Sequence, residues 1–147
     1  AGVDLIPTFF SFAGIKQPWK MHGHDLTPLL KDPASDWDHP ALVSFMGRNY
    51  GKDADRIPDD PDAHYLNGVP WYVSLRKDRY KYIRTLVEGE IEELYDIEND
   101  PEELTNLALS KSHAKTLREY RAALIAELRR TDAGIVDNLP AIKKLAD

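Results

Sequence analysis

One long polar segment of the sequence gathers side chains that could bind a substrate. It runs from Gly47 to Gly68 and carries cations, amides and rings near both ends: Arg48, Asn49, Tyr50, Lys52, His64, Tyr65 and Asn67. Arginine and lysine can bind an anionic group, and tyrosine or histidine can pack on a ring of a ligand. We therefore predict four substrate-binding residues: Arg48, Asn49, Tyr50 and His64. The alternative is a solvated connector, because long loops are also commonly disordered.

Two acidic pairs could pass for ligands of a divalent cation. Asp59-Asp60 lies between prolines in the polar segment, and Asp137-Asn138 follows the last predicted helix. Neither pair ends an apolar strand that would deliver its oxygens to one ion, so we interpret both as solvated. His22 and His24 have an H-x-H spacing, but Gly23 between them predicts a loop. We therefore predict that this chain binds no metal.

The composition excludes several classes of function. The 147 residues contain no cysteine, which excludes disulfides, thiolate zinc sites and cysteine nucleophiles. The formal net charge is -6 and no basic stripe appears, so we expect no nucleic-acid partner. No apolar run is long enough to span a bilayer, so we expect no membrane partner. With 42% hydrophobic and 30% charged residues, the chain has the balance of a globular domain.

The elements that would position these side chains begin with a short apolar helix. Asp4 is a suitable N-cap, Pro7 falls in the first turn and Gly14 suits the left-handed C′ position. Apolar residues cover most of its circumference: Leu5, Ile6, Phe9, Phe10, Phe12 and Ala13. Because so apolar a helix should be buried, we predict that it belongs to a larger body that this chain lacks. In the fragment alone, we expect self-association through this leading helix.

The remaining pattern predicts a small antiparallel sheet. After a loop with one helical turn near residues 26–30, strands are expected at 41–46, 71–76, 80–84 and 92–96. Asp100-Pro101-Glu102-Glu103 has the residues of an N-cap, an N1 proline and a capping box, which predicts a helix start.

The longest helix is expected over residues 112–131. Its apolar stripe comprises Leu117, Tyr120, Leu124 and Leu128. The residues expected to face water are Arg118, Glu119, Glu127 and Arg129. The predicted fold class is therefore α+β: a small antiparallel β-sheet packed by a C-terminal helix, with the leading helix belonging to a catalytic α/β domain.

Two stretches of the chain resemble motifs of a known family. The first comprises Asp4-Leu5-Ile6-Pro7-Thr8, Ala13-Gly14-Ile15 and Gly23-His24-Asp25-Leu26-Thr27-Pro28-Leu29-Leu30. It is similar to D-L-x-P-T … A-G-I … D-G-x-S-L-x-P-L-L, although His22 and Asp25 replace the usual Asp and Ser. The second comprises Arg79-Tyr80-Lys81-Tyr82-Ile83, the run from Glu93 to Glu103, and Asn106-Leu107-Ala108. It resembles R-Y-K-Y-I … E-L-Y-D-L-x-x-D-P-x-E … N-L-A. In this order the motifs are similar to the C-terminal part of type I sulfatases, of the alkaline phosphatase superfamily.

This resemblance implies a parent enzyme that hydrolyses the sulfate esters of a sulfated small molecule or carbohydrate. It also implies a calcium ion and a formylglycine made from Cys or Ser in a C/S-x-P-x-R motif. The chain has no cysteine and no serine followed by x-P-x-R, so we assign it no catalytic residue and expect the fragment alone to be inactive. A periplasmic or secreted location is expected from the family. C-terminal subdomains of the family can also lend loops to the active-site cleft, which suits residues 47–68.

Two other interpretations stay open. The chain could be the C-terminal part of a related phosphodiesterase or phosphonate monoester hydrolase, whose nucleophile is often an unmodified Thr or Ser. It could also be a free-standing, non-catalytic binding module. On the favoured interpretation, residues 1–147 form one C-terminal subdomain. Within it, 1–15 end the catalytic domain, 16–40 are a connector, 41–131 form the sheet and helices, and 132–147 are a tail.

Overall fold

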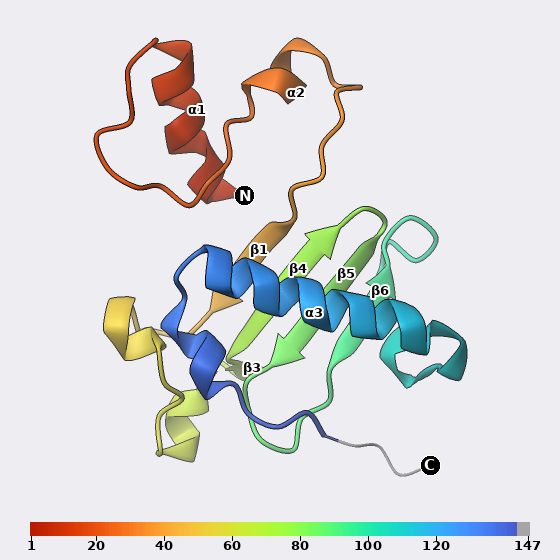
Figure 1. Cartoon of the computed structure of the whole chain (residues 1–147). Helices are drawn as coiled ribbons and strands as arrows, with labels where there is room; N and C mark the ends of the chain where they lie inside the picture. Colours follow the sequence, from red (N-terminus) through yellow and green to blue (C-terminus); the bar gives the residue numbers. More distant parts are fainter. Residues whose placement is uncertain (144–147) are drawn as a thin grey trace. The chain divides into compact units, whose positions relative to one another are not determined.

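The computed structural model describes residues 1–143 and divides the chain into two compact units. The first unit is Ala1–Ala41, and the second begins at Leu42 (Figure 1). Residues 144–147 of the predicted tail lie outside the described residues. Within residues 1–143, no helix combines the length and hydrophobicity needed to cross a bilayer.

The first unit is a short helix with a loop that returns beside it. A 3-10 turn at Gly2–Asp4 leads into helix α1, Leu5–Phe12, and helix α2 follows at Thr27–Lys31. Gly14 ends α1 with a φ of 64°, and the Ile15 N–H donates to the Phe10 carbonyl at 2.9 Å. This is the Schellman arrangement. The predicted leading helix and its terminal glycine are therefore confirmed.

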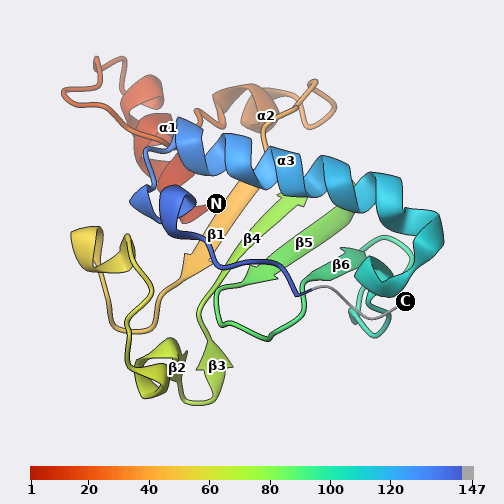
Figure 2. The ribbon, with the colours of Figure 1, turned by 60° about the horizontal axis from the view of Figure 1, so that its bottom comes forward.

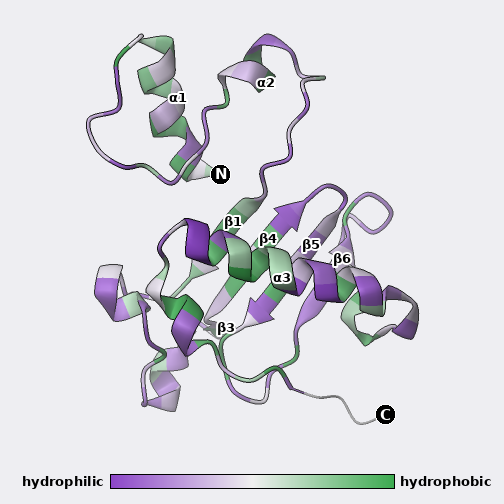
Figure 3. Cartoon of the chain, in the orientation of Figure 1, coloured by the Kyte–Doolittle hydropathy of each residue, from purple (hydrophilic) through white to green (hydrophobic). Residues whose placement is uncertain are grey.

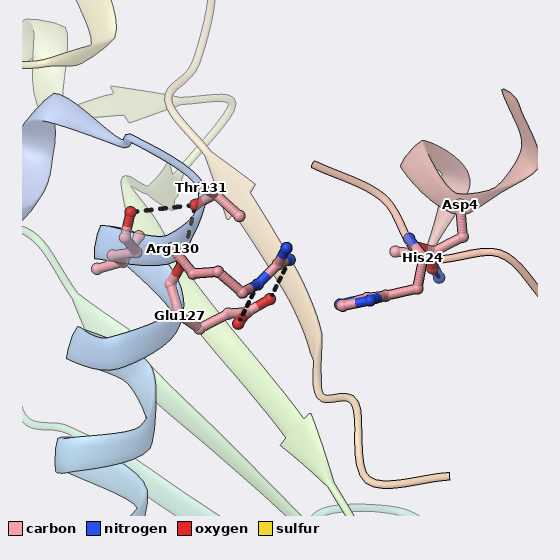
Figure 4. A network of polar contacts seen from close by, with 7 residues as sticks. Asp4, His24, Glu127, Arg130 and Thr131 are labelled. Carbon is pink, nitrogen blue, oxygen red and sulfur yellow. Dashed lines mark hydrogen bonds and ion pairs between the residues drawn. The ribbon is translucent and has the colours of Figure 1, made fainter. Parts of the chain in front are cut away.

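Polar residues of α1 fasten the helix to the returning loop. Asp4 Oδ1 accepts a hydrogen bond from the His24 backbone N–H at 2.7 Å, and the two residues lie side by side in Figure 4. Thr8 Oγ1 accepts from the Leu26 N–H at 2.9 Å and donates to the Asp4 carbonyl at 2.6 Å. Asp4 and Thr8 are both buried. The side of α1 that faces the loop is therefore its polar side.

The apolar residues of α1 lie on the outside. Leu5 and Ile6 are each 48% exposed, Phe9 is 61% exposed and Phe12 is 60% exposed. Figure 3 shows apolar residues distributed over α1 between its polar ones. Phe10 is partly covered, because its ring meets the Trp19 ring edge-on at a centroid distance of 6.1 Å. The expected exposure of apolar surface by this helix is confirmed, and Phe10 contributes least to it.

The second unit is a four-stranded antiparallel sheet with a helix across one face (Figures 1 and 2). The strand order is β1-β4-β5-β6, with β1 at Ala41–Phe45, β4 at Tyr72–Lys77, β5 at Tyr80–Thr85 and β6 at Glu93–Asp96. A separate two-stranded ladder pairs β2, Tyr65–Leu66, with β3, Val69–Pro70. Helix α3 spans Ala114–Arg130. The predicted α+β fold class is confirmed.

The core of this unit lies between α3 and one face of the sheet. The predicted helical stripe is buried there, as expected: Leu117, Tyr120, Leu124 and Leu128. It packs on side chains that alternate along the strands and are 0% exposed: Val73, Leu75, Tyr82 and Leu94. The Tyr120 hydroxyl donates to the Lys77 carbonyl at 2.5 Å, and burial raises the Tyr120 pKa to about 12.

Glu127 is the one residue of α3 whose predicted exposure is wrong. It is 6% exposed rather than water-facing. Arg130, one turn later, donates from Nε to Glu127 Oε2 at 2.8 Å, so the buried carboxylate is paired with a cation that is itself exposed (Figure 4). Thr131 Oγ1 donates to the Glu127 carbonyl at 3.0 Å and closes the end of the helix.

The helix start predicted at Asp100-Pro101-Glu102-Glu103 is also wrong, because these residues form a turn. Asp100 accepts from the backbone N–H groups of Leu104 and Thr105, at 3.1 and 2.8 Å, rather than capping a helix. Glu103 has a left-handed φ of 57°. This φ is incompatible with an α-helix. The Glu103 carboxylate binds Lys81 Nζ on β5 at 2.7 Å, so the turn is joined to the sheet by an ion pair.

Position 23 can hold only glycine, because the backbone of Val3 lies against it. A Cβ atom at this position would lie 2.0 Å from the Val3 carbonyl oxygen. We expect Gly23→Ala to destabilise the first unit by at least about 2 kcal/mol, since overpacking against backbone cannot relax by a side-chain movement. Hydrogen exchange of the α1 amides measures this. Gly2→Ala is the matched control, because nothing lies within 4 Å of its Cβ position. Equal protection in both variants would contradict the close approach.

The exposed face of α1 should make the purified chain self-associate, because contiguous apolar patches are seldom stable in water. We expect light scattering to give a mass that rises with concentration, and the double variant Phe9→Ser, Phe12→Ser to abolish the rise. Leu104→Ser is the control, since Leu104 is 77% exposed but lies in the second unit. A strictly monomeric wild-type chain would refute this expectation.

Candidate functional site

The segment 47–68 is folded, and both of its ends meet at Trp71. Gly47 has a left-handed φ of 61°, and a Cβ placed on it would lie 3.1 Å from Trp71 Nε1 and 3.8 Å from the Leu66 Cβ. At the other end, the Trp71 backbone N–H donates to the His64 carbonyl at 2.9 Å. Trp71 itself is 0% exposed. A rigid core residue therefore holds together the chain beside Arg48 and the chain at His64.

The interior of the segment contains short regular pieces that the sequence analysis treated as one loop. Gly51–Ala54 and Pro61–His64 are 3-10 turns, and β2 pairs with β3 across Asn67-Gly68. Asn67 and Gly68 have φ values of 52° and 78°. Two consecutive positive φ values are typical of a type I′ hairpin turn, for which Asn-Gly is the preferred sequence. This Asn-Gly signal could have revealed the hairpin from sequence alone.

Three predicted binding residues follow Gly47 directly. Arg48 and Tyr50 are exposed, with Tyr50 at 79%, and Asn49 is half-buried. The Asn49 N–H donates to the Met46 carbonyl at 3.0 Å, which closes a turn behind Arg48. Within residues 1–143, the Arg48 guanidinium makes no ion pair with the chain. A cation and a phenol ring are therefore presented to solvent from a fixed turn.

His64 is held in one tautomer. Its Nε2 lies 2.6 Å from the Pro58 carbonyl oxygen. Because a carbonyl can only accept, Nε2 carries the proton, and Nδ1 of the neutral ring is left as an acceptor. In the described part of the chain, no hydrogen bond or ring contact joins the side chains of Arg48, Asn49, Tyr50 and His64 to one another. The feature that they share is indirect: Gly47, which precedes Arg48, and the His64 backbone both lie against Trp71.

Acidic side chains dominate the middle of the segment. Asp59 and Asp60 are exposed, and Asp60 Oδ1 accepts from the Asp62 N–H at 3.0 Å, so this pair helps to form a turn. Asp137 and Asn138 lie in a 3-10 turn, where Asn138 Nδ2 donates to the Asp55 carbonyl at 2.8 Å. Within residues 1–143, no three His, Cys, Asp or Glu side chains gather in a way that could hold a metal ion. The described residues therefore do not fit a calcium site, and the sequence offers no cysteine and no Ser-x-P-x-R from which a formylglycine could be made.

His22 and His24 lie outside helices and strands, in the loop predicted for them. The His24 ring stacks on the His39 ring at a centroid distance of 3.9 Å, and Trp37 meets His39 edge-on at 4.8 Å. This cluster of rings closes the loop of the first unit.

The residues of the second sequence motif pair mainly with one another. Arg79 Nε donates to Asp96 Oδ1 at 3.1 Å, and this contact lowers the pKa of Asp96 to about 2. Lys81 binds Glu103. Asn106 Oδ1 accepts from the Leu94 N–H at 3.0 Å, and its Nδ2 donates to the Glu92 carbonyl at 3.0 Å. The motif therefore fixes β5, β6 and the turn after them, and has a structural role.

A network of polar contacts joins α3 to the sheet. The Tyr82 hydroxyl donates to Glu92 Oε2 at 2.8 Å, and Arg121 Nε donates to the same oxygen at 2.8 Å. Burial first, and the Glu92 carboxylate second, raise the pKa of Tyr82 well above its usual range. Tyr82 is 0% exposed, so it is a packing residue of the core.

Comparison with known proteins places these features in a family context. The chain is 36% identical over 122 residues to a Delta 4,5-hexuronate-2-O-sulfatase of Bacteroides thetaiotaomicron, which covers 83% of this chain and 22% of that protein. The solved structure of a 2-O GAG sulfatase matches 95% of this chain and 27% of its own, at 29% identity and a TM-score of 0.68. The phosphonate monoester hydrolase of Agrobacterium radiobacter matches 87% of this chain and 24% of its own, at 25% identity and a TM-score of 0.61.

These matches confirm the resemblance to sulfatases that the two sequence motifs indicated. No family model matches the chain. The chain spans about a quarter of the length of the proteins that it matches.

The contact between Gly47 and Trp71 gives a test of how rigid the Arg48 turn is. We expect Gly47→Ala to lower the free energy of unfolding of the second unit by about 1–3 kcal/mol, because it adds a left-handed strain and crowds a buried indole. Gly51→Ala is the matched control: Gly51 also has a positive φ, of 58°, but nothing lies within 4 Å of its Cβ position. Urea unfolding followed by Trp fluorescence measures both. If both variants lower the free energy of unfolding by the same amount, Trp71 does not support the turn.

Proposed function

We propose that this chain, which is homologous to one part of the sulfatases, is the C-terminal part of an enzyme that hydrolyses sulfate esters of carbohydrates. Its role there would be to form one wall of the substrate-binding cleft with residues 47–68. The chain supplies no nucleophile, since it has no cysteine and no Ser-x-P-x-R sequence. We therefore propose that it is inactive alone, and that formylglycine and calcium belong to the remainder of the enzyme.

The observation that carries this proposal is the junction at Trp71. A binding loop must hold its cations in place before the ligand arrives, because ordering a free loop would offset the energy of binding. Trp71 lies against Gly47, is fully buried, and donates a backbone hydrogen bond to the His64 carbonyl. This support favours a preformed binding surface over a solvated connector.

The side chains available at this surface suit a sulfated sugar. Arg48 can donate charge-assisted hydrogen bonds to an anionic ester, and Tyr50 offers an exposed ring for a sugar face. His64 Nδ1 can accept from a sugar hydroxyl, and Asn49 can donate or accept. The relative that is a hexuronate-2-O-sulfatase makes a sulfated saccharide the substrate class that we propose here.

A phosphonate or phosphate ester is the second candidate. The fold is shared with a phosphonate monoester hydrolase at a TM-score of 0.61, and an arginine binds either anion. Assay of the longer protein on matched sulfate and phosphonate esters would separate the two. We further propose that the enzyme is periplasmic or secreted, as expected from the family resemblance.

Replacing Arg48 in the longer protein tests the proposed cleft wall. Loss of one charge-assisted contact costs about 1.5–3 kcal/mol, so we expect Arg48→Ala to lower kcat/KM on the sulfated saccharide roughly ten- to a hundredfold. A small aryl sulfate, which lacks the sugar, serves as the second substrate.

Arg118→Ala is the control, because Arg118 is exposed on α3 and such surface changes typically stay within about 0.5 kcal/mol. Unchanged activity of Arg48→Ala on both substrates, at unchanged thermal stability, would refute a role in the cleft and leave residues 47–68 a connector.

A further inference from the structure

The face of the sheet opposite α3 has a hollow that the proposed function does not use. Side chains alternate along each strand, so the neighbours of the buried core residues point to this second face. The hollow has a volume of about 430 Å³ and crosses all four strands and the end of β3: Val43, Pro70, Tyr72, Ser74, Lys81, Ile83, Thr85 and Glu93. Its volume lies within the usual range of small-molecule sites. Every lining residue belongs to the second unit and lies outside residues 47–68.

One wall of the hollow is apolar and flat. The Tyr72 ring stacks on the Phe45 ring, with centroids 5.7 Å apart and planes inclined by 21°. This stack fixes the plane of Tyr72, which is only half-buried. Val43 and Ile83 extend the apolar surface along the neighbouring strands, and Val43 is 48% exposed. A rigid aromatic face with aliphatic side chains beside it suits the C–H face of a sugar ring better than it suits a ligand that is a flexible chain.

The other wall carries polar groups with unused hydrogen-bonding capacity. Within residues 1–143, the hydroxyls of Ser74 and Thr85 make no hydrogen bond to the protein. Glu93 Oε2 accepts from the Tyr95 hydroxyl at 2.6 Å, which leaves Oε1 as an acceptor. Two hydroxyls and one carboxylate oxygen can together bind several hydroxyl groups of a ligand.

The charges of the hollow disfavour an anion. Lys81 is its only lining cation, and Glu103 holds the Lys81 Nζ in two contacts, at 2.7 and 2.9 Å. Glu93 adds a second carboxylate beside it. With Lys81 neutralised and Glu93 remaining, a sulfate or phosphate group would meet net negative charge, whereas a neutral hydroxylated ring would not.

We propose that this hollow is a binding site for a neutral sugar ring, with Tyr72 under its C–H face and Ser74, Thr85 and Glu93 at its hydroxyls. The site goes beyond the proposed cleft wall and stands on separate residues. Its ligand class is also different: an uncharged pyranose rather than a sulfated one. It would hold an unsulfated part of a carbohydrate.

The test is an NMR titration of the full 147-residue chain with N-acetylglucosamine, and in parallel with N-acetylglucosamine 6-sulfate, which differs only in carrying the anionic group. We expect fast-exchange shifts centred on the amides of Ser74, Ile83 and Thr85, with a Kd on the order of 1 mM for the neutral sugar. The sulfated sugar should bind at least about tenfold more weakly, since a tenfold ratio corresponds to ~1.4 kcal/mol.

Two variants and one control make the result specific. Tyr72→Ala should raise the Kd at least about tenfold. Thr85→Val removes a hydroxyl with little change of shape, so it should weaken binding several-fold even if Tyr72→Ala fails to fold. Thr116→Val is the control, because Thr116 lies on α3 and away from the hollow; its Kd should equal that of the wild type.

Four results would overturn the proposal. The first is the absence of shifts at these amides up to a sugar concentration of about 100 mM. The second is equal or tighter binding of the sulfated sugar. The third is a set of shifts that depends on protein concentration without sugar, which would assign the face to contact with a second copy. Loss of neutral-sugar binding in a longer form of the protein would likewise assign it to an internal interface. None of these results depends on Arg48, so the proposed cleft wall is tested separately.

Discussion

The packing of Trp71 is the constraint on which the second unit depends. The Trp71 ring is fully buried. The Trp71 backbone N–H donates to the His64 carbonyl, and the Trp71 backbone carbonyl accepts from the Leu86 N–H at 2.8 Å. These contacts join the start of β4, the end of β5 and both ends of segment 47–68 in one place. A long polar segment loses much conformational freedom when it folds. Here that cost is offset at its ends by a core residue, while side chains between them, such as Arg48 and Tyr50, stay exposed.

The first unit follows the opposite arrangement. Helix α1 turns Asp4 and Thr8 inward and its leucine, isoleucine and phenylalanine side chains outward. When the unit is alone in water, nothing offsets the free-energy cost of exposing the apolar face of this helix. The polar contacts inside the unit determine its local geometry, whereas its apolar side requires another surface. This division explains why a motif rich in apolar residues is held together by a carboxylate, a hydroxyl and the small volume of Gly23.

Both motifs that identify the family are structural in this chain. Asp4, Thr8 and Gly23 belong to the first motif and fasten the helix to its loop. Arg79 pairs with Asp96, and Lys81 pairs with Glu103, within the second. The recognisable sequence pattern therefore identifies the scaffold, and the proposed binding residues lie outside both motifs. This is why the resemblance identifies a family without identifying a substrate.

The sequence by itself determined the α+β class, the strands of the four-stranded sheet, the apolar stripe of α3 and the resemblance to sulfatases, because these depend on local periodicity and on short motifs. Only the tertiary structure decided the turn at residues 100–103, where Lys81 holds Glu103 from a distant strand and overrides a strong local helix signal. Only the tertiary structure revealed that Trp71 lies against both Gly47 and the His64 backbone, and that Glu127 is buried while paired with the exposed Arg130. Contacts between residues far apart in the chain leave no periodic trace in the sequence, so the pattern alone could name Arg48 and His64 but could not place them on one support.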